Sequence, residues 1–141
     1  MSKNLSNKII SKEDISSTCV NMTAAWLAGK VANTISNAVF HYDLNRYNFV
    51  DHLVIGTGLG TLAYRKAGGG FKGLAAGLVA GTMFSALWEP FENIYVQKAD
   101  GAWWKSIDTL SDVAVVYAGN ILGFLGERFK DYIKKKIKSS D

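Results

Sequence analysis

The chain has a single cysteine, Cys19, and a single proline, Pro90, among its 141 residues. One cysteine excludes an internal disulfide framework and a zinc site built from several cysteines. No stretch sustains an alternation of apolar and polar residues, so the sequence predicts no β-strand. The first 18 residues also lack the continuous apolar core and small-residue cleavage site of a signal peptide, and we expect no cleaved signal.

Charge is absent from residues 73–88, and 14 glycines accompany a composition that is 48% hydrophobic. This combination is common in transmembrane helices, where glycine permits close backbone approach. In a soluble helix each interior glycine costs about 1 kcal/mol relative to alanine. Four segments of low charge and helical length, 17–40, 49–64, 71–96 and 107–129, are joined by short polar connections. The sequence therefore predicts an all-α fold, a four-helix transmembrane bundle.

We expect three regions along the chain. A polar N-terminal segment, 1–16, precedes the four-helix membrane domain, 17–129, and a basic amphipathic tail, 130–141, follows it. The tail places apolar residues on one face and lysines on the rest, which suits either an anionic inner leaflet or a solvated helix end. The segment 49–64 is the shortest of the four, because about 20 residues are needed to span a bilayer.

The basic residues are distributed unequally between alternate connections. If the N-terminus is cytoplasmic, the cytoplasmic set contains Lys3, Lys8, Lys12, Arg65, Lys66, Lys72, Arg128, Lys130, Lys134, Lys135, Lys136 and Lys138. The opposite set contains only Arg46, Lys98 and Lys105, with Lys30 inside the first segment. Short cytoplasmic loops retain Lys and Arg, so this asymmetry favours a multi-pass protein of the inner or plasma membrane with both termini in the cytoplasm.

Small residues recur every four positions, so that they share one helix face. The third segment has such a stripe in Gly73, Gly77, Gly81, Ser85 and Glu89, and the second has one in His52, Gly56, Gly60 and Tyr64. Small residues at this spacing mark the face on which another helix packs closely. We expect these faces to pack helices of one chain together, and they could also support a homo-oligomer.

Most ionisable residues of the four segments lie on or beside these faces, at the ends that the topology places on the non-cytoplasmic side. His41 ends the first segment. The candidate binding residues are Asp51, His52, Glu89, Glu92, Asp108, Asp112 and Asn120. Ionisable groups inside a membrane domain are costly unless they are paired or hydrated, so a converging set predicts a functional site. Alternatively, these carboxylates cap helices, pair with Lys98 or Lys105, or meet water.

Two kinds of chemistry suit this set. Carboxylates with histidine could hold a divalent cation. Alternatively, Glu89, Asp108 or Asp112 could act as a general base toward a lipid headgroup, with His52 as the proton carrier. None of the familiar metal-binding spacings is present. Nucleic-acid binding is disfavoured, because the basic residues are not interleaved with stacking aromatics. The glycine-rich "VIGTGLG" is not a dinucleotide loop, since Thr61 stands where the third glycine is required.

Three motifs resemble those of the VanZ-like superfamily of small polytopic membrane proteins. They are "DH" at Asp51 and His52, "WEPFEN" at residues 88–93, and "DTLSDVAVVYAGNILGFLG" at residues 108–126. VanZ proteins usually show E-x-x-Q where this chain has E-x-x-E, so the resemblance is greater to the YjdF-type branch. It implies a polytopic membrane protein of the cell envelope and no established reaction.

The sequence thus favours a membrane protein whose outward-facing Asp/Glu/His cluster binds a cation or a lipid or cell-wall headgroup, with membrane lipid as its partner. Three alternatives stay open. The protein could be an enzyme that modifies lipid headgroups, a structural or assembly protein of the membrane, or a soluble helical bundle. The last alternative would fit a mean hydropathy near zero, which averages apolar segments with two polar ends.

Overall fold

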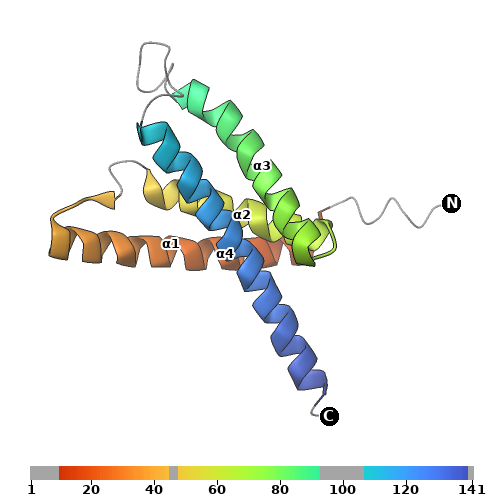
Figure 1. Cartoon of the computed structure of the whole chain (residues 1–141). Coiled ribbons are helices and arrows are strands. Elements are labelled where there is room, and N and C mark those ends of the chain that lie inside the picture. The colour runs from red at the N-terminus through yellow and green to blue at the C-terminus, as the bar shows by residue number, and fades with distance from the viewer. Residues whose placement is uncertain (1–9, 45–47, 93–106, 140–141) are drawn as a thin grey trace.

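The computed structural model describes residues 10–44, 48–92 and 107–139, and all regular structure in these ranges is helical. Four helices follow one another: α1 (Lys12–Phe40), α2 (Phe49–Lys66), α3 (Gly70–Phe91) and α4 (Ile107–Lys138). Figure 1 shows the end of α1, the start of α2, the end of α3 and the start of α4 toward one side of the molecule. The all-helical fold predicted from the sequence is confirmed.

Helix α1 begins at Lys12, earlier than the predicted residue 17, because Ser11 and Asp14 form a capping box. The Ser11 hydroxyl accepts a hydrogen bond from the Asp14 backbone N–H at 3.1 Å, and the Asp14 carboxylate accepts one from the Ser11 N–H at 2.8 Å. Two backbone donors that no helical carbonyl could reach are thereby satisfied. The predicted polar segment 1–16 therefore includes the first turn of α1.

The other helix ends also differ from the prediction. Helix α3 ends at Phe91, and residues 93–96 of the predicted segment lie outside the described part of the chain. Helix α4 does not end at Phe129 but continues to Lys138, so most of the basic tail is its last two and a half turns. Residues 127–138 contain neither glycine nor proline, and nothing in the sequence interrupts the helix there.

A turn of three glycines joins α2 to α3. Gly68, Gly69 and Gly70 have φ values of 85°, 77° and 53°, in the left-handed region that residues with a β-carbon rarely adopt. The chain reverses within these residues, so that α3 packs antiparallel to α2 (Figure 1). Helix α2 contacts all three other helices, and its largest interface is with α4.

At the interface between α2 and α4, glycines of each helix lie directly against the backbone of the other helix. A β-carbon at Gly56 would overlap the carbonyl oxygen of Val116, and one at Gly123 would overlap that of Thr57. On α3, the buried residues are Gly73, Gly77, Gly81, Ser85 and Glu89. The predicted stripe therefore does face the other helices of the same chain. A homo-oligomer stays a prediction, and it would have to use other surfaces.

The polarity of the interior is reversed relative to that of a water-soluble bundle. Among the described residues, 5 hydrophobic side chains and 12 polar or charged ones are buried. Large apolar side chains instead face outward, as in the α1 stripe of Leu27, Val31, Ile35 and Val39, each more than half exposed. A monomeric soluble protein rarely exposes such continuous apolar surface.

Two helices, α3 and α4, are long and apolar enough to cross a membrane. Helix α2 has 18 residues, which is about 27 Å of helix, and it carries Asp51, His52, Arg65 and Lys66 near its ends. Length and composition therefore identify two candidate spans among the described residues, whereas the sequence analysis predicted four.

Candidate metal centre

Three buried ionisable side chains converge from three helices. His52 lies in the first turn of α2, Glu89 in the last turn of α3, and Asp112 in the second turn of α4. The distance from His52 Nε2 to Glu89 Oε1 is 3.7 Å, and that from His52 Nδ1 to Asp112 Oδ1 is also 3.7 Å. One ligand atom from each residue lies within 4.8 Å of the other two. We call this set the triad.

The histidine of the triad has its two ring nitrogens in different environments. Nδ1 lies 3.1 Å from the backbone carbonyl oxygen of Asn48, one turn earlier. If Nδ1 donates a proton to this oxygen, Nε2 carries a lone pair, which is the arrangement that second-shell carbonyls impose on metal-binding histidines. Nε2 is fully buried and has no hydrogen-bond partner among the described residues. A cation between Nε2 and the carboxylates would satisfy it.

Glu92 is buried but does not join the triad. Its Oε1 accepts a hydrogen bond from the Asn48 amide at 2.8 Å, and its Oε2 accepts one from the Trp88 indole N–H at 2.8 Å. Both carboxylate oxygens are thus held by neutral donors on α3 and at the N-cap of α2. Glu92 ties the end of α3 to the start of α2 beside the triad.

The other predicted site residues are separate from the triad. Asp51 is exposed on the outer face of α2. Asn120 is fully buried two turns beyond Asp112, where its amide donates to the Val116 carbonyl at 3.0 Å and packs over Gly77 and Gly81 of α3. His41 is exposed at the end of α1. Asp108 lies in the first turn of α4, and its side chain is outside the described part of the structure.

Two cavities border the triad. One, of about 260 Å³, is lined by His52 and Glu92 together with Asn48, Asp51, Ile55 and Trp88. The other, of about 170 Å³, lies between α3 and α4 and includes Ser85, Glu89 and Tyr117 in its lining. Each volume exceeds that of several water molecules, which occupy about 30 Å³ each in the liquid.

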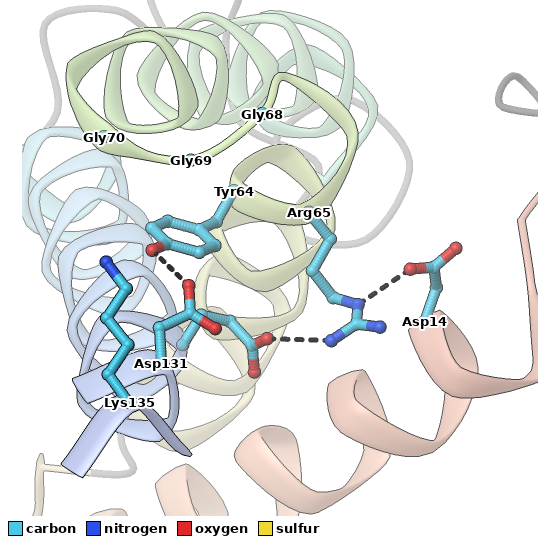
Figure 2. A pocket seen from close by; sticks show the side chains of 9 residues that line it. Asp14, Tyr64, Arg65, Gly68, Gly69, Gly70, Asp131 and Lys135 are labelled. Atoms are coloured by element: carbon cyan, nitrogen blue, oxygen red, sulfur yellow. Dashed lines mark hydrogen bonds and ion pairs between the residues drawn. The ribbon is translucent and has the colours of Figure 1, made fainter. Parts of the chain in front are cut away.

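A second polar cluster, at the opposite ends of α2 and α3, was not predicted. Arg65 donates to Asp14 at 2.7 Å and to Glu127 at 3.1 Å, so that it joins α2 to α1 and α4 (Figure 2). Glu127 also accepts from Lys130 at 2.8 Å and from Ser17 at 2.5 Å. The adjoining cavity, of about 440 Å³, is bordered by the glycine turn. We call this set the Arg65 cluster.

The electrostatics of the Arg65 cluster are those of well-paired charges. Hydrogen bonds from Lys66 and Arg65 hold the pKa of Asp14 well below its usual value of 3.8. The partnership with Asp14 correspondingly raises the pKa of Arg65. Cations at this end therefore already have anionic partners, whereas Nε2 of His52 at the other end lacks a hydrogen bond. The triad is the stronger candidate for a ligand site.

Comparison with known protein families, curated proteins and solved structures finds no match for this chain. The VanZ-like resemblance consequently stays a prediction that rests on the three motifs. What the protein does must be argued from the triad and from the polarity of its surface.

Proposed function

We propose that this protein is a multi-pass membrane protein that binds one divalent transition-metal cation, such as Zn²⁺ or Mn²⁺, at the triad. The observation that carries the proposal is the convergence of His52, Glu89 and Asp112, buried, from three helices. With a neutral imidazole and two ionised carboxylates, the triad has a charge of −2, which a divalent cation neutralises. One imidazole nitrogen with two carboxylate oxygens suits Zn²⁺ or Mn²⁺ better than Mg²⁺ or Ca²⁺, which prefer oxygen alone.

The spacing of the ligand atoms is compatible with such an ion. Zinc bonds of about 2.1 Å in tetrahedral geometry separate neighbouring ligand atoms by about 3.4 Å. The separation of His52 Nε2 from Glu89 Oε1 is 3.7 Å, whereas Asp112 Oδ1 lies 3.7 Å from Nδ1, the other ring nitrogen. Glu89 thus already faces Nε2, and the Asp112 side chain would have to turn toward Nε2 to complete the triad around an ion. A fourth position is left for water or another ligand.

The membrane placement is supported by the reversed polarity of the bundle. Apolar side chains cover the outside of α1, α3 and α4, and the glycine and polar faces are inside. The positive charges at alternate connections favour all four helices crossing, with both termini cytoplasmic and the triad toward the non-cytoplasmic side. The VanZ-like motifs, which include His52, Glu89 and Asp112, favour the same placement in the cell envelope.

A metal-binding measurement tests the function. The purified protein would be stripped with a chelator in detergent, and Zn²⁺ and Mn²⁺ binding would be measured by titration calorimetry. We expect one ion per chain in the wild type and in the control Asp51→Asn, which removes a neighbouring exposed acid. Glu89→Gln and Asp112→Asn should each weaken binding at least tenfold with the helical content unchanged. Equal binding by wild type and Glu89→Gln, or no binding by wild type, would refute the site.

A lipid-headgroup-modifying enzyme is a second candidate, favoured by the same coordination. Catalytic zinc sites have three protein ligands and an open position, whereas structural ones have four protein ligands. The triad offers three. Turnover of a headgroup ester by the metal-loaded wild type, lost in Glu89→Gln, would support this candidate, and metal binding without turnover of any headgroup tested would leave only the binding function.

A further inference from the structure

Asn48, the residue before the first turn of α2, does not cap its own helix. Its backbone is left-handed, with φ of 53° and ψ of 23°, and its side chain makes no capping hydrogen bond. Ser11, at the same position before α1, has an extended backbone and caps α1 through Asp14. The Asn48 amide instead donates to Glu92 Oε1, at the end of α3, at 2.8 Å. An uncommon backbone conformation together with a diverted side chain points to a role beyond starting the helix.

Glu92 is a fixed acceptor for this amide. It is 4% exposed, and its second oxygen, Oε2, accepts a hydrogen bond at 2.8 Å from the indole N–H of Trp88, one turn earlier on α3. Two donors from different elements therefore set the orientation of one carboxylate, and a buried carboxylate with both oxygens bonded has little freedom to turn. The conformation of Asn48 is consequently held from α3 as well as from α2.

The conformation of Asn48 determines where its carbonyl oxygen points, and that oxygen lies 3.1 Å from Nδ1 of His52. Each ring nitrogen also faces one carboxylate. Nε2 lies 3.7 Å from Glu89 Oε1, and Nδ1 lies 3.7 Å from Asp112 Oδ1. Each carboxylate favours a proton on the nitrogen that it faces, so the pair does not decide between the two neutral forms of the ring. The Asn48 carbonyl decides, because it can only accept a hydrogen bond and thus favours the proton on Nδ1.

We infer that Glu92 is a positioning residue of the metal centre. Through Asn48 it keeps the His52 proton on Nδ1 and the lone pair on Nε2, the nitrogen that faces Glu89. The inference rests on the proposed function, since this lone pair is the one that binds the cation. Partners that orient a metal-binding histidine contribute about 10- to 100-fold to metal affinity without touching the ion. The two acids of "WEPFEN" thus have different roles: Glu89 binds the ion, and Glu92 orients the histidine.

The position of the His52 proton in the metal-free protein tests this inference. Nitrogen NMR of protein labelled at its histidines, in detergent at about pH 8.5, where an ordinary imidazole is neutral, distinguishes a protonated ring nitrogen from one with a lone pair. His41, which is exposed, provides the reference for a ring in water, and His41→Gln assigns the signals. We expect the proton on Nδ1 in wild type. Glu92→Met, which removes both acceptor oxygens at similar side-chain length, should increase the Nε2-protonated form at least about twofold.

Two further variants separate this role from general support of the fold. Trp88→Phe removes the indole donor to Glu92, so its His52 proton should stay on Nδ1 and its Zn²⁺ affinity should stay within about twofold of wild type. Asn48→Ala removes the same hydrogen bond as Glu92→Met, from its other partner. Each should weaken Zn²⁺ binding about tenfold, and the double variant should be no weaker, because both act through one bond. Helical content by circular dichroism should be unchanged in all of them.

Three results would overturn the inference: a wild-type proton on Nε2, an unchanged proton position in both Glu92→Met and Asn48→Ala, or a Trp88→Phe variant as altered as Glu92→Met. Failure of the proposed function gives a different pattern. If the wild type has the expected proton position, which Glu92→Met shifts, but binds no Zn²⁺, the cation at the triad is refuted and the control of the histidine by Glu92 is upheld. Zn²⁺ binding that Glu92→Met does not weaken would refute only the positioning role.

Discussion

Gly60 of α2 lies against the backbone of Asn120 in α4, so closely that a β-carbon at position 60 would overlap the Asn120 carbonyl oxygen. Gly56, Gly119 and Gly123 have the same relationship to carbonyl oxygens of the facing helix. Backbone cannot move aside as a flexible side chain can. The distance between α2 and α4 is therefore set by these four glycines, and the same two helices carry His52 and Asp112.

Gly60→Ala should destabilise the protein by about 1–3 kcal/mol, because the added methyl forces α2 and α4 apart. Gly58→Ala is the matched control. The three atoms nearest to a β-carbon at Gly58 all belong to the flexible Met22 side chain, with its sulfur at 2.9 Å. We expect that variant to be neutral or slightly more stable, since alanine favours helix by about 1 kcal/mol. Thermal unfolding followed by circular dichroism in detergent measures both, and equal stabilities would contradict the interpretation.

Arg65→Met should destabilise the protein by about 1–2 kcal/mol. The substitution leaves Glu127, which is 3% exposed, without one of its cationic partners and removes the ion pairs that join α2 to α1 and α4. The value is modest because Arg65 itself is partly exposed, and because Lys66 and Lys130 still pair with Asp14 and Glu127. Arg128→Met makes the same change of charge at an exposed position and should be neutral. Thermal unfolding compares the two variants with wild type.

Because Asp14 is paired with Lys66 and Arg65, the stability of the protein should depend on pH in the acidic range. Because the pKa of Asp14 in the folded protein is held below the usual 3.8, mainly by Lys66 and then by Arg65, the ionised form is favoured by folding. This stabilisation is complete above pH 3.8 and is lost as the pH falls toward the lower pKa of the folded state. The melting temperatures of wild type and Asp14→Asn should therefore converge below pH 3.8. A constant difference down to pH 2.5 would show that Asp14 acts only through its capping of α1.

The helices and the buried face of α3 could be predicted from the sequence, whereas the helix ends could not. Spacing by four identified Gly73, Gly77 and Gly81 as the packed face, because a close helix contact requires small residues wherever it occurs. The beginning of α1 depends instead on the capping box, the two reciprocal hydrogen bonds between Ser11 and Asp14. The end of α4 depends on the absence of any breaker after Phe129, which a pattern of low charge does not detect.

The two polar clusters illustrate the same limit. His52, Glu89 and Asp112 were predicted together because each lies at a helix end that an up-and-down topology brings to one side. Asp51 was included for the same reason, and the structure places it on the exposed face of α2. The Arg65 cluster was missed although Ser17 lies four residues before Asn21, whose amide also donates to Glu127 at 3.1 Å. Spacing within a helix gives its face, but which faces meet depends on how the helices pack.

Zn²⁺ or Mn²⁺ should raise the stability of the chelator-stripped protein. At an ion concentration 100 times the dissociation constant, binding to the folded state alone adds about 2.7 kcal/mol. The melting temperature should therefore increase with ion concentration in wild type and in Asp51→Asn, and should increase clearly less at the same ion concentrations in Asp112→Asn. An equal increase in all three would mean that the ion binds elsewhere.

The topology can be tested with single cysteines in a Cys19→Ser background, which is needed because Cys19 is exposed. Lys72→Cys lies in the first turn of α3, and Lys98→Cys lies in the connection to α4. If α3 crosses the membrane in the proposed direction, a membrane-impermeant maleimide applied to intact cells should label position 98 and not position 72. Permeabilised cells should label both, which controls for local accessibility.

The opposite labelling would place the triad on the cytoplasmic side, where ions and lipids of the inner leaflet would be its ligands. Labelling of neither position in intact cells and of both in permeabilised cells, with release by carbonate, would mean that the exposed apolar faces contact protein, and the proposed metal site would lose the membrane as its setting.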